Sequence, residues 1–319
     1  MLSSLNSGTA PLRFEDRPGL LKIHGKEVTV TGRLFRMARL EADGYEFLEG
    51  DPEEFLDRLR KCDSGADMFT FTQRLPETTP RYQYPMEWDN FAAVEITTFD
   101  HWWRHQIGFK ARNKAKQAAK KGVVLREVAF GEALAKGIWE IYNECPVRQG
   151  RRYYHYGKDL RTVYREEATH LDRAIFVGAF CEDKLIGFIK LVADETNTQA
   201  GLMNIVSMIK HRDKAPTNAL VAEAVRLCAG RHTRYLVYSR FAYGSKERSG
   251  ISDFKERNGM SRVDVPRYYV PLTAKGRIAL QLGVHRPLRS RIPEPMLSRL
   301  RDLRAAWYER QFRAVAHPS

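Results

Sequence analysis

The chain lacks three features that would place it outside the cell or in a membrane. None of its apolar runs in 319 residues approaches the length that crosses a bilayer. The N-terminal stretch MLSSLNSGTAPLRFEDRPG lacks the apolar segment of a signal peptide. Only four cysteines occur, without a C-x-x-C pair, which argues against a zinc site and a disulfide framework. We therefore expect a cytoplasmic protein that holds no metal.

Acidic residues are the minority among the charged ones. There are 39 Asp and Glu against 53 Lys and Arg, which gives a net charge of +14. The stretch 109–121 has six basic and no acidic residues, and the stretch 275–319 has ten basic and three acidic ones. Such clusters attract polyanions: a phosphorylated cofactor, RNA or anionic lipid. A solvated basic face is the ordinary alternative for each of them.

The hydrophobic content of 43% permits a sizeable core, and the pattern of the chain predicts mixed α/β structure. In the first third we expect a hairpin, a helix opened by Asp51-Pro52, two strands and one long helix; these cover 25–41, 51–59, 68–73, 91–97 and 100–121. From 123 to 272 the expected order is strand, helix, helix, three strands, helix, strand, helix, strand. From about Pro295 an Arg-rich amphipathic helix with Trp307 on its apolar side should follow.

The stretch HRDKAPTN (211–218) matches the catalytic loop of protein kinases, H-R-D-x-x-x-x-N. The glycine-rich loop of kinases is missing, and the flanks are an apolar β-like run and an amphipathic helix. We therefore interpret it as a turn from strand to helix, whose free backbone N–H groups form an anion site. Its candidate contacts to a donor phosphate are Arg212, Lys214, Thr217 and Asn218, the last two at the expected N-cap. A plain helix cap is the alternative.

The order of elements after residue 123 resembles the GNAT acyltransferase superfamily, most closely its FemABX-like branch. The stretches that carry the resemblance are RNKAKQAAKKGVVL (112–125), GAFCEDKLIGFIKLV (178–192), PTNALVAEAVRLC (216–228) and ISDFKERNG (251–259). The resemblance implies an α/β (α+β) fold with a mixed, mostly antiparallel sheet flanked by helices. It also implies three parts: a degenerate acyltransferase-like unit (1–111), the acyltransferase domain (112–274) and a basic helical tail (275–319).

The implied activity is transfer of an acyl group from acyl-CoA to an amino group of a small-molecule or peptide acceptor. CoA-using members carry glycines at the strand-to-helix turn, yet this chain has none between Gly201 and Gly230. Fem-like members use aminoacyl-tRNA instead, and the clusters 109–121 and 275–319 suit such a donor. A non-catalytic RNA-binding protein on the same fold is a third reading. The tail also suggests contact with a membrane surface.

The resemblance assigns residues to the transfer chemistry. We expect Tyr238, at the end of a strand, to be the general acid, Glu144 to be the base, and His155 to assist as an acid or base. The loop that follows Glu144 should cover the acceptor. Its candidate binding residues are Arg148, Gln149, Arg151, Tyr154 and Tyr156. A mobile basic surface loop is the alternative reading of this stretch.

Overall fold

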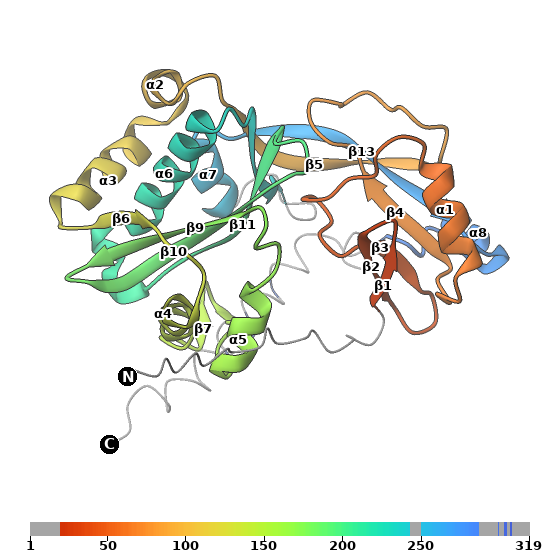
Figure 1. Cartoon of the computed structure of the whole chain (residues 1–319), viewed down its shortest axis with the longest axis horizontal. Coiled ribbons are helices and arrows are strands. Elements are labelled where there is room, and N and C mark those ends of the chain that lie inside the picture. The colour runs from red at the N-terminus through yellow and green to blue at the C-terminus, as the bar shows by residue number, and fades with distance from the viewer. Residues whose placement is uncertain (1–19, 243–249, 287–298, 300–302, 305–306, 308–319) are drawn as a thin grey trace, which may run out of the picture.

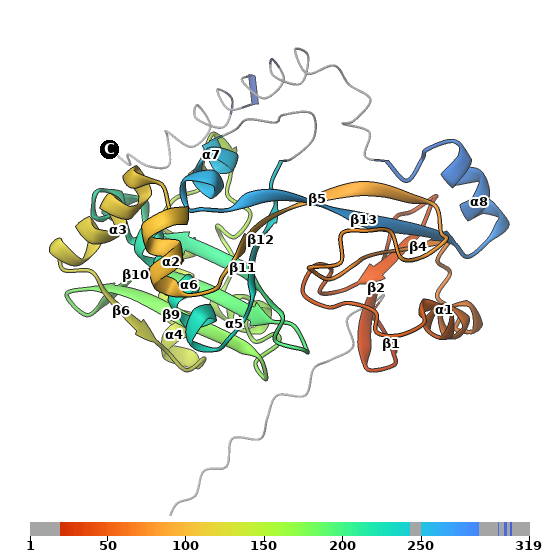
Figure 2. The ribbon, with the colours of Figure 1, turned by 90° about the horizontal axis from the view of Figure 1, so that it is seen from above.

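A single large sheet runs through the protein, with helices on both faces (Figures 1 and 2). The computed structural model describes residues 20–242, 250–286, 299, 303, 304 and 307. The strand order is β1-β2-β3-β4-β13-β5-β12-β11-β10-β9-β6, and only the pairs β3–β4 and β11–β12 are parallel. This confirms the predicted fold class, a mixed and mostly antiparallel sheet.

The strands are β1 (Leu20–Ile23), β2 (Lys26–Thr31), β3 (Met37–Leu40), β4 (Met68–Thr72), β5 (Met86–Glu95), β6 (Val124–Glu127), β7 (Val147–Arg148), β8 (Arg151–Arg152), β9 (Ala174–Cys181), β10 (Lys184–Ala193), β11 (Gln199–Ser207), β12 (Tyr235–Arg240) and β13 (Ser261–Pro271). The helices are α1 (Pro52–Lys61), α2 (Phe99–His101), α3 (Phe109–Lys120), α4 (Glu132–Tyr142), α5 (Leu160–Glu167), α6 (Pro216–Gly230), α7 (Gly250–Arg257) and α8 (Ala274–Gln281). There are also two short helical segments of other types: the π-helix η1 (Trp102–Gln106) and the 3₁₀ helix η2 (Ile209–Lys214).

One order of elements occurs twice along the chain. The first unit has the hairpin β1–β2, then β3, helix α1 and β4, and the second has β9–β10, β11, α6 and β12. In each unit the helix connects two parallel strands. The strand that follows each unit pairs with the last strand of the other unit: β5 pairs with β12, and β13 pairs with β4. Figure 2 shows β5 and β13 side by side between the two units. The residue limits expected for the units stay a prediction.

Local signals in the first unit act as the sequence predicts. The Asp51 side chain caps α1 by accepting the N–H of Glu53 at 3.0 Å, and Pro52 occupies the first turn. Leu56 and Leu59 are fully buried and belong to the same core as Phe69 of β4. The helix is therefore held on the sheet by its apolar face.

The long helix expected over 100–121 is wrong, because the chain breaks at Ile107 and Gly108. The N–H of Gly108 donates to the carbonyl of Arg257 at 2.8 Å, and the buried Trp102 donates its indole N–H to the carbonyl of Asn258 at 3.1 Å. Because this segment docks against the end of α7, the expected helix is interrupted by η1 and by the extended residues Ile107 and Gly108.

Helices cover the second unit on opposite faces of the sheet (Figure 1). On one face α6 buries Leu220, Val221 and Val225 in the largest core cluster, with α3 packed beside it. On the other face α4 and α5 pack over β9 and β10, around Phe188 and Tyr142. This leaves the ends of β11 and β12 between the two layers.

The predicted tail helix lies mostly outside the described residues. The tail residues that are described, Arg299, Leu303, Arg304 and Trp307, are helical, and the side chains of Leu303 and Trp307 are exposed. Within the described part of the chain, no helix combines the length and apolarity needed to cross a membrane.

Candidate active site

The parallel strands β11 and β12 pair over only three residue pairs and then separate. Pairing ends at Gly201 and Val237, and the register of β12 against β5 shifts before Arg240. Ser239, inside this bulge, has a positive φ of 50°. Bulges and left-handed residues concentrate where a strand must aim a side chain at a site. The opening between β11 and β12 is therefore the candidate active site.

A tyrosine from the first unit lines β11 at this opening. Tyr45 donates its hydroxyl to the carbonyl of Leu202 at 3.3 Å. Its ring lies directly against Gly201, where an added Cβ would come within 1.9 Å of the ring carbon Cε1. Glycine at 201 is thus required by the close approach of the two units.

Lys255 of α7 lies at the end of β12. Its side chain is completely buried, its Nζ donates to the carbonyl of Arg240, and it lies 4.6 Å from the ring centroid of Tyr238. Burial lowers the pKa of Lys255 to about 8. An amine with this pKa can both hold and release a proton near neutral pH. Lys255 lies in the ISDFKERNG stretch, and no sequence signal marked it out, because its burial follows from the packing of α7.

The structure places Tyr238 where the sequence suggested, at the first position beyond the parallel pairing. It is half-buried and packs against the core cluster under α6. Its role as an acid stays a prediction, but its contact with Lys255 ties the two side chains into one arrangement.

The turn between β11 and α6 differs from the expected helix cap. Helix α6 begins at Pro216, its N-cap residue is Ala215 with a left-handed φ of 52°, and no side chain caps it. Thr217 instead shares a hydrogen bond of 2.7 Å with the hydroxyl of Ser207, and Asn218 is buried. The prediction of Thr217 and Asn218 as N-cap is therefore wrong, because the 3₁₀ turn η2 and Pro216 set the entry to the helix.

The carboxylate of Glu144 accepts hydrogen bonds from backbone N–H groups of this turn. It accepts the N–H of Ile209 at 2.6 Å and the N–H of Lys210 at 3.0 Å. Arg148 pairs with the same carboxylate at 3.2 Å and also donates to the carbonyl of Ser207 at 2.8 Å. Both side chains, expected as base and acceptor clamp, thus bind other parts of the chain, and those two roles stay predictions.

The remaining candidates of the turn and the acceptor loop lie at or near the surface. Arg212 is exposed and Lys214 is half-buried. Residues 147–152 form the small hairpin β7–β8, with Gln149 at its turn at a φ of 53°. Tyr154 is 77% exposed and lies under the Lys158 ammonium, 3.9 Å from its ring centroid. Gln149 and Arg151 are exposed and Tyr156 is half-buried.

His155 belongs to a buried polar network between α4, α5 and the sheet. Its ring stacks on Tyr142 with centroids 4.1 Å apart, and Tyr142 donates to Glu167 at 2.7 Å. Burial, with the nearby Lys158, lowers the pKa of His155 to about 4, so the ring is neutral at pH 7. The sequence placed His155 in the acceptor region, but its buried position makes it a weak base.

Two further members of the network were not expected from the sequence. Asn204 of β11 donates its amide to both oxygens of Glu167, at 2.9 and 3.0 Å. The buried Lys190 donates to the carbonyl of Glu167 at 2.8 Å, and burial lowers the pKa of Lys190 to about 8. Asn204 lies beyond Gly201, where β11 has left β12, so this network supports the wall of the opening.

Comparison with known proteins gives a likeness of fold. No protein-family model matches the sequence, and no curated protein matches it. Among solved structures, the C-terminal DUF2156 domain of a putative lysylphosphatidylglycerol synthetase from Agrobacterium fabrum aligns at 13% identity, with a TM-score of 0.53, over 82% of this chain and 86% of that one. The L-PGS from Bacillus licheniformis aligns at 12% identity, with a TM-score of 0.54, over 83% and 88%. FemX aligns at 10% identity, with a TM-score of 0.53, over 76% and 83%. The chain therefore has the fold of FemX and of the lysylphosphatidylglycerol synthetase domain.

Proposed function

We propose that the chain is an aminoacyltransferase that moves an acyl group from the 3′ ester of an aminoacyl-tRNA to an amine. The observation that carries this proposal is the occupied turn before α6. A CoA pyrophosphate needs free backbone N–H groups at such a turn. At the start of this turn Glu144 accepts the N–H groups of Ile209 and Lys210, only 12% of its side chain is exposed, and Arg148 holds it in place.

A basic surface beside this turn supports a large polyanionic donor. Helix α3 and η2 lie side by side, because Gln117 and Lys121 both donate to the carbonyl of Asp213 at 3.1 Å. The exposed basic residues of the two elements are Lys110, Lys114, Lys116, Lys120, Lys210 and Arg212. Asp213 itself is paired with Lys121 at 3.0 Å, which neutralises it. The surface therefore offers several phosphate contacts, each of which makes binding weaken with salt.

The named neighbours agree with an activated acyl donor. One of them is, by its name, a domain of a putative synthetase of lysylphosphatidylglycerol, a lipid that carries a lysyl group. In the reaction proposed for this chain, the amine nitrogen attacks the ester carbonyl carbon, an amide bond forms, and the ester C–O bond breaks. Because the Lys255 side chain is buried, we assign it a relay of protons and not direct contact with the substrate: one proton goes to the departing 3′-oxygen, and the proton that the amine loses returns to Lys255. Tyr238 holds the Lys255 ammonium over its ring.

The test is a transfer assay that separates the two donors. Mixed tRNA charged with radiolabelled amino acids, and radiolabelled acetyl-CoA, are each incubated with the protein and a low-molecular-weight cell extract. Transfer is scored as label in a product that survives the mild base that cleaves esters. We expect product from the tRNA donor alone, and its loss in Lys255→Met but not in the exposed control Lys136→Met.

Two outcomes would contradict the proposal. Product from acetyl-CoA with none from tRNA would show that the donor is acyl-CoA. Salt-sensitive tRNA binding without any transfer, in assays that detect a positive-control transferase, identifies the chain as an RNA-binding protein on this fold.

A further inference from the structure

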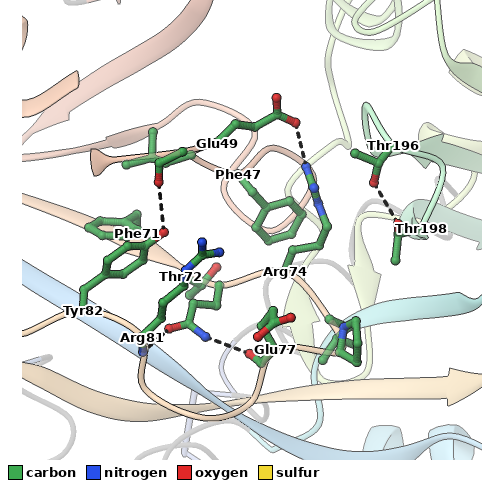
Figure 3. A pocket seen from close by; sticks show the side chains of 15 residues that line it. Phe47, Glu49, Phe71, Thr72, Arg74, Glu77, Arg81, Tyr82, Thr196 and Thr198 are labelled. Carbon is green, nitrogen blue, oxygen red and sulfur yellow. Dashed lines mark hydrogen bonds and ion pairs between the residues drawn. The ribbon is translucent and has the colours of Figure 1, made fainter. Parts of the chain in front are cut away.

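A cavity lies in the first unit, at the position that corresponds to the candidate active site of the second unit. Beyond their three paired residues β3 and β4 separate, as β11 and β12 do. A cavity of about 490 Å³ opens there, which is the size of a small-molecule site. Its walls come from the loop before α1, the end of β4, the loop 73–82 and two threonines of the β10–β11 turn (Figure 3).

The loop that forms one wall is rigidly held. Gln73 donates its amide to the carbonyls of Glu77 and Thr79, at 3.0 and 2.9 Å, and accepts the N–H of Arg81 at 3.0 Å. The hydroxyl of Tyr268 accepts the same N–H at 2.8 Å. Since Gln73 and Tyr268 are themselves buried, this wall is preformed.

Aromatic rings and charged groups share the lining. Phe47, Phe71 and Tyr82 supply apolar faces. Arg74 lies 5.3 Å from the Phe47 ring centroid and is already neutralised, by Asp194 at 2.6 Å and Glu49 at 3.2 Å. Figure 3 shows these side chains, with Arg81 and Glu77, gathered around the cavity.

Two charged side chains of this lining, one basic and one acidic, make no ion pair with a described residue. Within the described part of the chain Arg81 makes no ion pair, and its guanidinium lies 5.9 Å from the centroid of the Tyr82 ring. The Glu77 side chain likewise makes no ion pair with a described residue, and both side chains are exposed to solvent. An unpaired cation and an unpaired carboxylate beside aromatic walls match a ligand that carries both charges and an apolar group.

We propose that this cavity binds a zwitterionic amino acid or short peptide with an apolar side chain. Its carboxylate pairs with Arg81 in the two-bond geometry that guanidinium groups favour, and its ammonium pairs with Glu77. The apolar side chain packs between Phe47 and Tyr82. The site is separate from the opening at β12, so binding here does not depend on the transfer reaction.

The test is calorimetric binding of three probes to the full chain. L-alanyl-L-phenylalanine has both charges, its C-terminal amide lacks the carboxylate, and its N-acetyl form lacks the ammonium. Each lost ion pair should weaken binding about tenfold. Arg81→Gln should bind the dipeptide and its amide equally, and Glu77→Gln should bind the dipeptide and its N-acetyl form equally. The exposed control Arg277→Gln should retain both preferences.

The proposal is overturned if the wild-type protein binds none of the probes at millimolar concentration. It is also overturned if Arg81→Gln keeps the full preference for the free carboxylate. Because the readout is binding alone, neither result bears on the donor assay above.

Discussion

Replacing Lys255 by methionine should raise the stability of the protein at neutral pH while abolishing transfer. The pKa of Lys255 is about 8 instead of 10.5, which corresponds to a cost of about 3 kcal/mol for the buried charged form. Methionine has a similar shape and no charge, so this cost disappears. The lost hydrogen bond to the carbonyl of Arg240 offsets about 1.5 kcal/mol of the gain. A net stabilisation of about 1.5 kcal/mol remains at pH 7.

The sign of this difference should change with pH. Between pH 8 and 10.5 the unfolded chain still binds a proton at Lys255 and the folded chain does not, so the wild-type protein gains stability as pH rises. Above about pH 10.5 the charge cost is gone in the wild type, and Lys255→Met should be less stable by about 1.5 kcal/mol, the contribution of the lost hydrogen bond. Urea unfolding of both proteins at the two pH values measures the difference, with Lys136→Met as the exposed control.

One result would refute this reasoning. If Lys255→Met is less stable than the wild type at pH 7 and equally so at pH 10.5, the lysine is a structural hydrogen-bond donor with no buried charge. Its loss of activity would then say nothing about proton transfer.

Further predictions concern the walls of the opening. Gly201→Ala should destabilise the protein by about 2 kcal/mol in urea unfolding, because the new methyl group collides with the Tyr45 ring, and adding Tyr45→Ala should recover part of the loss. Glu167→Leu removes the partner of the buried Tyr142 hydroxyl and of the half-buried Asn204 amide, and should cost about 3 kcal/mol by the same measurement. Glu144→Gln should cost about 2 kcal/mol and leave the protein without thermal stabilisation by CoA, whereas Glu144→Ala, which frees two backbone donors, should gain it if the turn retains its shape.

Elements with a local cause could be predicted from the sequence. Helix α1 follows from Asp51-Pro52 and its apolar stripe, and α6 follows from the stripe at Leu220, Val221 and Val225. The break at Gly108 could not, because its cause is a hydrogen bond to Arg257, far along the chain. Local patterns carry no information on such partners, so one continuous helix was the reasonable prediction.

The candidate site likewise contains residues that local patterns predict and residues whose role depends on distant partners. Tyr238 could be placed at the end of a strand because the alternation of the strand is local. Glu144 reaches Ile209 across 65 residues of sequence, and its part in closing the turn became visible only from the folded chain. Lys255 matters because it is buried, and Asn204 matters because it pairs with the buried Glu167; both depend on what α7 and α5 pack against.

Because β5 pairs with the second unit and β13 pairs with the first, the sheet can be completed only late in synthesis. Strand β4 has β3 on one side, but its other edge is covered only by β13, which the ribosome makes near the end of the described chain. At usual rates of translation the edge of β4 waits on the order of ten to forty seconds for its partner. An uncovered strand edge invites pairing with other chains. The nascent first unit is therefore the stage at which we expect this protein to need chaperones, and early termination should leave two incomplete sheets.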